Sequence, residues 1–202
     1  MAPSLQYDSL TEAYCDAFST LLAEVFAAGE PLARCLDIST EEICEVMTDL
    51  CQTTEFHRHS IIALYDGQLV AGLLAGDFLT PKPEEDHPVQ ALLKELSADF
   101  RQHHSLERGQ CLSIMELACH PQHGGQGISQ QLIKRALTQA AEHGFTQAIA
   151  EATGRVSQYL FKEKFGFAKL NEIAYRDFHW HGQMPFAAST EHPTIEFLHK
   201  TL

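Results

Sequence analysis

Residues 113–144 read SIMELACHPQHGGQGISQQLIKRALTQAAEHG, and this stretch decides the fold. It begins with a short apolar run that His120 and Pro121 end, because proline has no N–H to give to a sheet. Three glycines follow within four positions. After them, apolar residues recur three or four positions apart from Ile128 to Ala141. The stretch therefore predicts a buried strand, a glycine-rich turn and a helix, in that order.

The glycine-rich turn has the chemistry of a phosphate site. The first N–H groups of a helix have no intrahelical partners and lie at the positive end of its dipole, and residues without side chains let a ligand approach them. Two familiar phosphate loops are excluded, since the stretch contains neither Gly-Lys-Ser/Thr nor G-x-G-x-x-G. The alternative is that the glycines only make a tight connection between strand and helix.

The turn also resembles a known motif. Gln122-His123-Gly124-Gly125-Gln126-Gly127 matches the Q/R-x-x-G-x-G/A signature of the GNAT superfamily of acyl-CoA-dependent N-acetyltransferases, and Lys164-Phe165-Gly166-Phe167 is similar to the family's K-L-G-F ending of a later helix. The resemblance implies that acetyl-CoA is the co-substrate, that backbone amides of the loop bind its pyrophosphate, and that the central strand holds its thioester carbonyl. The residues expected to contact acetyl-CoA are Leu117, Ala118, Cys119, Gln122, His123, Gly124, Gly125, Gln126, Gly127, Ile128 and Ser129.

Length and composition indicate a soluble globular protein. At 202 residues, with 45% hydrophobic and 20% charged residues, we expect a single GNAT domain over 1–202 with a substantial core. The chain has no apolar run long enough to span a bilayer, and its N-terminus has no basic region followed by an apolar one, so we expect no membrane partner and no signal peptide. Six scattered cysteines without a C-x-x-C pair indicate reduced thiols in a cytoplasmic protein.

Charge and histidine content limit which binding partners and metal ions we expect. A net charge of −13 at pH 7 argues against general nucleic-acid binding and slightly favours a cationic or amine partner. The twelve histidines include no H-x-x-x-H or H-E-x-x-H spacing, so we expect packed or solvated histidines and no metal site. The choice between monomer and homodimer stays open.

The remaining patterns complete an α/β fold (an α+β mixed sheet). We expect the GNAT fold, a mixed and twisted sheet of about seven strands with helices on both faces. Asp66-Gly67 between two apolar runs is a strong hairpin signal. The predicted elements are helices over 11–28, from 39, over 89–104 and over 157–164, strands over 4–7, 60–65, 68–78, 145–151, 167–178 and 194–199, and a loop over 80–86.

Acetyl transfer to an amine needs a base, because a primary amine is mostly protonated at pH 7. Glu30 follows the first helix in Phe26-Ala-Ala-Gly-Glu30-Pro31-Leu32, which resembles the arylalkylamine branch of GNATs, of the insect dopamine-acetylating type, where this glutamate is the proposed general base. Glu116 lies in an otherwise apolar strand, where a carboxylate needs a partner or a task. We rank Glu30 first and Glu116 second, with an ordinary solvated or ion-paired carboxylate as the alternative for each.

The departing thiolate needs a proton. In many GNATs a tyrosine four residues before the K-x-G-F glycine supplies it, and this chain has Lys162 there. The arylalkylamine branch has two Ser/Thr hydroxyls four residues apart, and Thr153 and Ser157 match that spacing at the cost of a one-residue insertion. Helix capping is the alternative for both hydroxyls, and Tyr159 is an outside candidate for the acid.

These features predict an N-acetyltransferase that passes acetyl directly from acetyl-CoA to a primary amine in a ternary complex. The expected acceptor is a small-molecule, arylalkylamine-like amine. Two alternatives stay open: a non-catalytic acyl-CoA-binding or sensing module, and a protein N-acetyltransferase.

Overall fold

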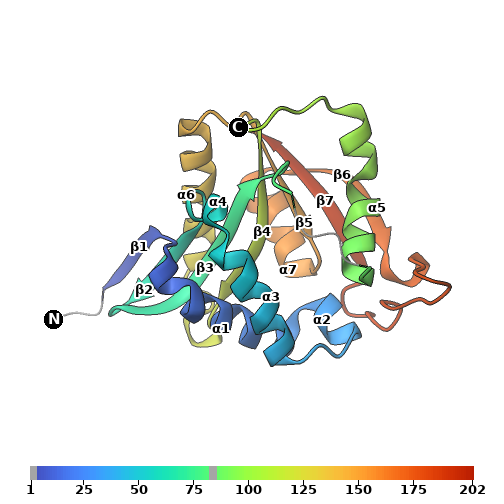
Figure 1. Ribbon diagram of the computed structural model, residues 1–202, viewed down its shortest axis with the longest axis horizontal. Helices are drawn as coiled ribbons and strands as arrows, with labels where there is room; N and C mark the ends of the chain where they lie inside the picture. The colour runs from blue at the N-terminus through green and yellow to red at the C-terminus, as the bar shows by residue number, and fades with distance from the viewer. Residues whose placement is uncertain (1–3, 82–85) are drawn as a thin grey trace.

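The computed structural model describes residues 4–81 and 86–202 and contains a seven-stranded sheet in the order β1-β2-β3-β4-β5-β7-β6. Strands β4 and β5 pair in parallel, and the other neighbours are antiparallel. The predicted mixed sheet is confirmed. The strands are β1 (Leu5–Ser9), β2 (Ile61–Tyr65), β3 (Gln68–Asp77), β4 (Cys111–Cys119), β5 (Gln147–Ala152), β6 (Ala168–Ala174) and β7 (Thr194–Thr201) (Figure 1).

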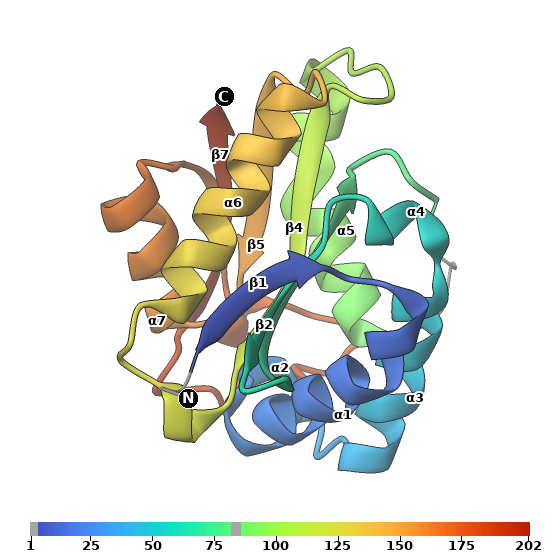
Figure 2. The ribbon, with the colours of Figure 1, turned by 90° about the vertical axis from the view of Figure 1, so that its left-hand side faces the viewer.

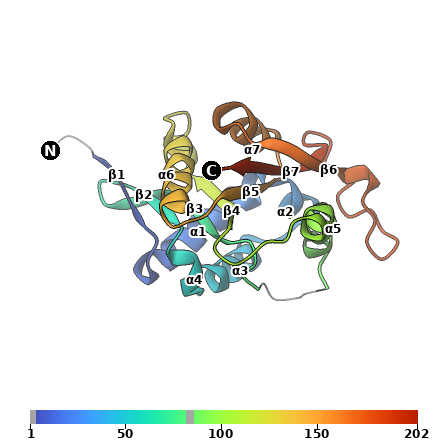
Figure 3. The same cartoon turned by 90° about the horizontal axis from the view of Figure 1, so that it is seen from above.

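Helices cover both faces of the sheet, as predicted. Figure 3 shows α6 and α7 on one face and the other five labelled helices on the opposite face. Within the described ranges, no helix combines the length and the apolar character needed to cross a bilayer. The helices are α1 (Glu12–Gly29), α2 (Pro31–Cys35), α3 (Thr40–Gln52), α4 (Thr54–His57), α5 (Pro88–His103), α6 (Ile128–Glu142) and α7 (Arg155–Tyr159).

Local chemistry explains where α3 begins and where the β2–β3 hairpin turns. Ser39 and Glu42 form a capping box that begins α3, with the Ser39 hydroxyl 3.2 Å from the Glu42 N–H. Gly67 turns the β2–β3 hairpin with a φ of 80°. The strand predicted over 4–7 runs from Leu5 to Ser9, and the helix predicted over 11–28 runs from Glu12 to Gly29 with Thr11 as its N-cap.

Some predicted elements differ in extent. The strand predicted over 167–178 ends at Ala174, because Tyr175 begins a 3₁₀ turn. Helices α2 and α4 were not predicted, since helices of five and four residues are too short to show a period. Within the loop predicted over 80–86, residues 82–85 lie outside the described residues.

The sheet separates the hydrophobic core into layers. Alternate residues of β5 show the division: Ala148 and Ala150 pack under α6, whereas Ile149 packs under α5. Helices α1 and α3 cover β2, β3 and the end of β4 on the α5 side. The helix predicted over 89–104 is α5, which packs on β6 and β7.

The two parallel strands separate halfway along their length. Strands β4 and β5 pair only from Cys111↔Gln147 to Ile114↔Ala150, after which β4 stays with β3, and β5 stays with β7. Met115 is an extra residue in β4 relative to β3, and such a bulge bends and twists a strand. The carboxyl ends of β4 and β5 therefore diverge. Figure 2 shows the loop after β4, helix α2 and helix α7 together at this end of the sheet.

Candidate active site

The glycine-rich loop connects the diverging end of β4 to α6. A short 3₁₀ turn over Pro121–His123 leads into Gly125 and Gly127, whose φ angles of 74° and 77° are ones that side chains rarely adopt. Gly127 is the N-cap of α6, and no side chain caps the helix there. The N–H groups of the first turn of α6 are therefore left without side-chain partners at the positive end of the helix, as an anion site requires.

The other residues predicted to contact acetyl-CoA lie next to this loop. Leu117 and Cys119 pack on the α6 face of the sheet, and Ala118 packs on the opposite face. Burial raises the pKa of the Cys119 thiol, which does not favour a thiolate nucleophile. The buried Nδ1 atom of His123 has no hydrogen-bond partner in the described part of the chain, and its ring lies 5.0 Å from that of Tyr65.

Glu30 stands at the junction of α1 and α2. Its Oε2 atom accepts a hydrogen bond of 2.6 Å from the N–H of Ala33, and its Oε1 atom is buried without a hydrogen bond of ordinary geometry among the described residues. Burial raises the pKa of this carboxyl; the N–H of Ala33, the hydroxyl of Thr153 and the imidazole of His192 offset part of the rise. A carboxylate whose pKa is raised toward neutrality suits a general base.

The structure brings Thr153 to Glu30 from a distant part of the sequence. Thr153 directly follows β5, and its hydroxyl is close enough to Glu30 to lower the pKa of the carboxyl. The neighbouring Gly154 also approaches α2, because a Cβ added there would lie 3.6 Å from the ring of Pro31. The end of β5 and the start of α2 thus form one site.

The capping alternative holds for one of the two hydroxyls. The Ser157 hydroxyl donates to the carbonyl of Gly154 over 2.9 Å and lies 3.4 Å from its N–H, so Ser157 caps the start of α7. Gly154 is the N-cap of that helix, and Thr153 precedes it. The geometry therefore gives Ser157 a structural task and leaves the side chain of Thr153 facing Glu30.

Glu116 is contributed by β4, whereas Glu30 meets the end of β5. Glu116 is beside the bulge in β4, opposite Leu74. The pKa of the Cys51 thiol in α3 is raised to about 11, mainly by burial, and the Glu116 charge adds to this rise. Glu116 therefore lies near enough to α3 for its charge to act on the Cys51 thiol.

The structure also shows the surroundings of Lys162, which stands where the family resemblance implies a tyrosine. Residues 160–164 form a π-helix, which holds one residue more per turn than an α-helix and so accounts for the one-residue insertion. The Nζ atom of Lys162 lies 2.7 Å from Oε2 of the buried Glu196 on β7, which gives this ammonium a structural partner away from β4. Tyr159 is half exposed, with its ring 5.6 Å from Nζ of Lys164.

Two residues near Glu30 escaped prediction from the sequence. His192 lies in the connection between β6 and β7, and its Nδ1 atom accepts a hydrogen bond of 3.2 Å from the N–H of Arg155. Tyr175 is fully buried, and its hydroxyl donates to the carbonyl of Thr153 over 2.8 Å. No spacing or motif in the sequence predicts either residue, because both are far from Glu30 in the sequence. They come near it only where the chain folds back between β6 and β7.

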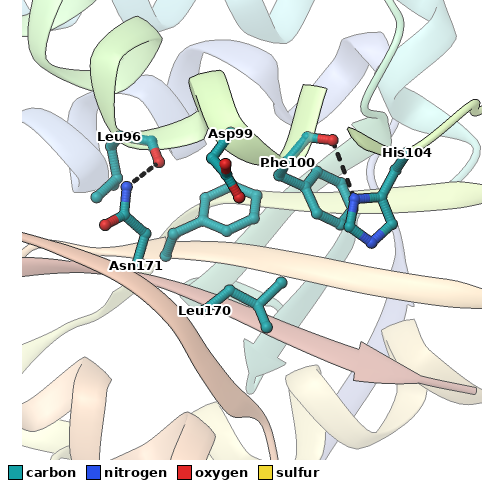
Figure 4. A pocket seen from close by; sticks show the side chains of 7 residues that line it. Leu96, Asp99, Phe100, His104, Leu170 and Asn171 are labelled. Atoms are coloured by element: carbon teal, nitrogen blue, oxygen red, sulfur yellow. Dashed lines mark hydrogen bonds between the residues drawn. The ribbon is translucent and has the colours of Figure 1, made fainter. Parts of the chain in front are cut away.

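Two cavities lie away from this site. One of about 120 Å³ lies between α5 and β6 (Figure 4), where Asn171 donates to the carbonyl of Leu96 over 2.8 Å and His104 donates to the carbonyl of Phe100 over 3.1 Å. The other, of about 520 Å³, is a polar groove between β1 and α6, lined by Tyr7 and Arg135 among others. Among the residues with resolved placement, no group of three or more His, Cys, Asp or Glu side chains could hold a metal ion.

Comparison with known proteins identifies the class. Residues 32–167 match the model of the Acetyltransferase (GNAT) family, so the chain belongs to that family. The family and the fold agree with the prediction that acetyl-CoA is the co-substrate.

Solved structures share the fold across nearly the whole chain, at low sequence identity. Arylalkylamine N-acetyltransferase 2 from Aedes aegypti is 21% identical with a TM-score of 0.80, covering 98% of this chain and 99% of that one. A polyamine N-acetyltransferase from Drosophila melanogaster is 17% identical with a TM-score of 0.79, covering 98% and 100%. The C-terminal condensation domain of Ebony, solved with β-alanyl-dopamine, is 13% identical with a TM-score of 0.89, covering 98% and 99%. The expected likeness to the arylalkylamine branch is thus confirmed at the level of fold.

Proposed function

We propose that this protein transfers acetyl from acetyl-CoA directly to a small-molecule primary amine. The observation that carries the proposal is an uncapped helix start after β4 together with the buried Glu30, which meets Thr153 at the end of β5, where the two parallel strands have separated. Pyrophosphate binds the amides over 122–129, and the thioester lies along β4 at Leu117 to Cys119. The two substrates then meet between the diverging strands.

Glu30 is the base in this mechanism, with Glu116 as the second candidate. Glu30 takes a proton from the bound ammonium, directly or through water, so that the neutral amine attacks the thioester carbonyl. The backbone of β4 stabilises the oxyanion that forms. The thiolate of CoA leaves and receives a proton, for which Thr153 is the first candidate and Ser157 the second, since the hydroxyl of Ser157 is engaged by Gly154.

The surroundings of Glu30 favour an acceptor with a single amine. Among the described residues, the side chains with a resolved interaction with this carboxylate are a hydroxyl, an imidazole, a thiol and a phenol, from Thr153, His192, Cys35 and Tyr175. The pKa values of the Cys35 thiol and the Tyr175 phenol are raised, mainly by burial, so both groups are neutral near pH 7. A polyamine would need a further anion for its second ammonium, whereas an arylalkylamine needs only apolar surroundings.

Release of free CoA thiol from acetyl-CoA tests the proposal. The purified protein is assayed with 2-phenylethylamine, tryptamine, agmatine, spermidine and a lysine-containing peptide. We expect turnover that is fastest with the two arylalkylamines. Fastest turnover with the peptide would instead support a protein N-acetyltransferase.

The non-catalytic alternative predicts a different result. A module that only senses acyl-CoA would bind acetyl-CoA in a calorimeter and release no thiol with any amine. That combination would contradict the proposed function. We place the protein in the cytoplasm as part of the same proposal, since its six cysteines are all free thiols.

A further inference from the structure

The turn between β5 and α7 is held by side chains at every residue. Each of the four residues 152–155 has a backbone group that bonds to a side chain, and two of these side chains, Tyr175 and His192, lie outside α7. The bonds run from Gln158 to the carbonyl of Ala152 (3.2 Å), from Tyr175 to that of Thr153 (2.8 Å), from Ser157 to that of Gly154 (2.9 Å), and from the N–H of Arg155 to His192 (3.2 Å).

Gln158 ties this turn to the α7 face of the sheet. Its side chain is 8% exposed, and its amide donates a second hydrogen bond, of 2.8 Å, to the carbonyl of Thr194 at the start of β7. The β5–β7 pairing ends at Ala152↔Glu196, so the amide joins the two strands where they separate. Both of its N–H groups are used, which fixes the side chain.

Lys162 holds the next turn of the helix to the same strand. It lies four residues after Gln158, and its ammonium is 2.8 Å from Oε1 of Glu196, whose side chain is only 6% exposed. Gln158 and Lys162 therefore attach the α7 segment to the ends of β5 and β7 at two points.

Tyr175 holds the same turn from the opposite face. Its ring is fully buried in the cluster under α5, together with Phe186 and Phe197. Its hydroxyl reaches the carbonyl of Thr153, the residue whose own hydroxyl faces Glu30. The peptides on both sides of the Thr153 Cα atom are thus fixed, one from each face of the sheet.

We propose that Gln158 and Tyr175 are positioning residues, which hold the Thr153 hydroxyl against Glu30 for acetyl transfer. The proposal rests on the proposed function and extends it to residues that do not touch the substrates. Buried hydrogen bonds that fix a backbone also fix the side chain attached to it, and displacement of a reacting group by about 1 Å can cost 10²-fold in rate.

Two substitutions remove these hydrogen bonds with little change in shape. Gln158→Met keeps the length of the side chain and removes both N–H groups, and Tyr175→Phe removes only the hydroxyl. For each variant we expect kcat to fall about tenfold, because the Thr153 hydroxyl is misplaced. We expect the KM for acetyl-CoA to stay within about twofold, because the glycine loop is unchanged.

The pH profile gives an independent readout. The Thr153 hydroxyl lowers the pKa of Glu30, so its displacement should move the acidic limb of kcat/KM for the amine to higher pH. In Gln158→Met the other groups around Glu30 are retained: the N–H groups of Leu32 and Ala33, the imidazole of His192, the thiol of Cys35 and the phenol of Tyr175.

A double-mutant cycle separates positioning from general destabilisation. If Gln158 acts through Thr153, Gln158→Met should cost about tenfold in the wild-type background and less than twofold in a Thr153→Val background. Ser97→Ala is the matched control, because Ser97 is 1% exposed and donates a similar hydrogen bond of 2.8 Å to the carbonyl of Leu93 in α5. We expect this control to lower the melting temperature and leave kcat unchanged.

The possible results distinguish failure of the positioning role from failure of the proposed acetyl transfer. A tenfold loss that persists in the Thr153→Val background, or an equal loss in Ser97→Ala, would contradict the positioning role and leave the proposed function standing. Unchanged kcat in Gln158→Met and Tyr175→Phe would do the same. Absence of thiol release by the wild-type protein would contradict the proposed function and the positioning role with it.

Discussion

Glu30 is a carboxylate held in surroundings that disfavour its charge. One of its oxygens is bonded to α2, and the other is buried without a hydrogen bond of ordinary geometry among the described residues. Such a group costs stability, and it is retained where its chemistry is needed.

Removal of this carboxylate should abolish most activity. Glu30→Gln keeps an acceptor for the N–H of Ala33 but cannot take a proton, so we expect kcat/KM for the amine to fall by about 10²–10³. Glu116→Gln is the comparison that ranks the two carboxylates, and we expect a loss of less than about tenfold, because the charge of Glu116 acts on the Cys51 thiol in α3. The reverse order would make Glu116 the base.

Glu30→Gln should also stabilise the protein at neutral pH. The pKa of Glu30 is raised in the folded state by burial, so between the ordinary glutamate pKa and the raised value the folded state binds more protons than the unfolded state. Wild-type stability therefore falls as pH rises through that window. We expect the melting temperature of Glu30→Gln to exceed that of the wild type at pH 7.5, with the difference shrinking at pH 4. A difference that is equal at both pH values would show that the charge is not the cause.

At the scale of one element, α6 depends on glycine conformations at its start. Gly127 has a φ of 77° with no heavy atom within 4 Å of an added Cβ, so the backbone angle, rather than lack of space, disfavours a side chain there. We expect Gly127→Ala to raise the KM for acetyl-CoA at least fivefold, because the backbone that presents the amides is strained by about 1 kcal/mol or more. Gly67→Ala in the hairpin is the matched control, since its φ of 80° and open surroundings are the same. An equal rise in the KM for acetyl-CoA in Gly67→Ala would contradict a role for the glycine-rich loop in binding acetyl-CoA.

The α7 segment depends on an ion pair of Lys162, the residue at the position where the family resemblance implies a tyrosine. Lys162→Met would leave the buried Glu196 without its nearest cation, with Lys169 at 3.9 Å as the remaining neighbour. We expect a loss of about 2 kcal/mol in the free energy of unfolding, equivalent to a fall of about 4–8 °C in melting temperature. Lys162→Arg should retain most of the stability. A Lys162→Met protein that melts normally and fails only in turnover would indicate a direct role in proton transfer.

At the scale of the whole molecule, the sequence predicts what short-range chemistry controls. The strand–turn–helix around Gly127, the hairpin at Gly67 and the capped start of α3 are each encoded within a few residues, and the structure confirms all three. The contact of Glu30 with Thr153 depends on how β4 and β5 diverge, which no local pattern reports. The sequence shows that Lys162 replaces the tyrosine expected from the resemblance. It does not show the π-helix or that Glu196 is the partner of Lys162.

A crystal structure of the protein with acetyl-CoA would show directly whether the glycine-rich loop binds the pyrophosphate. We expect the two phosphates to accept hydrogen bonds from backbone amides of residues 122–129, with the thioester carbonyl beside Leu117 to Cys119 and the acetyl group on the Glu30 side of the diverging strands. Phosphates bound elsewhere, such as in the polar groove between β1 and α6, would contradict that expectation.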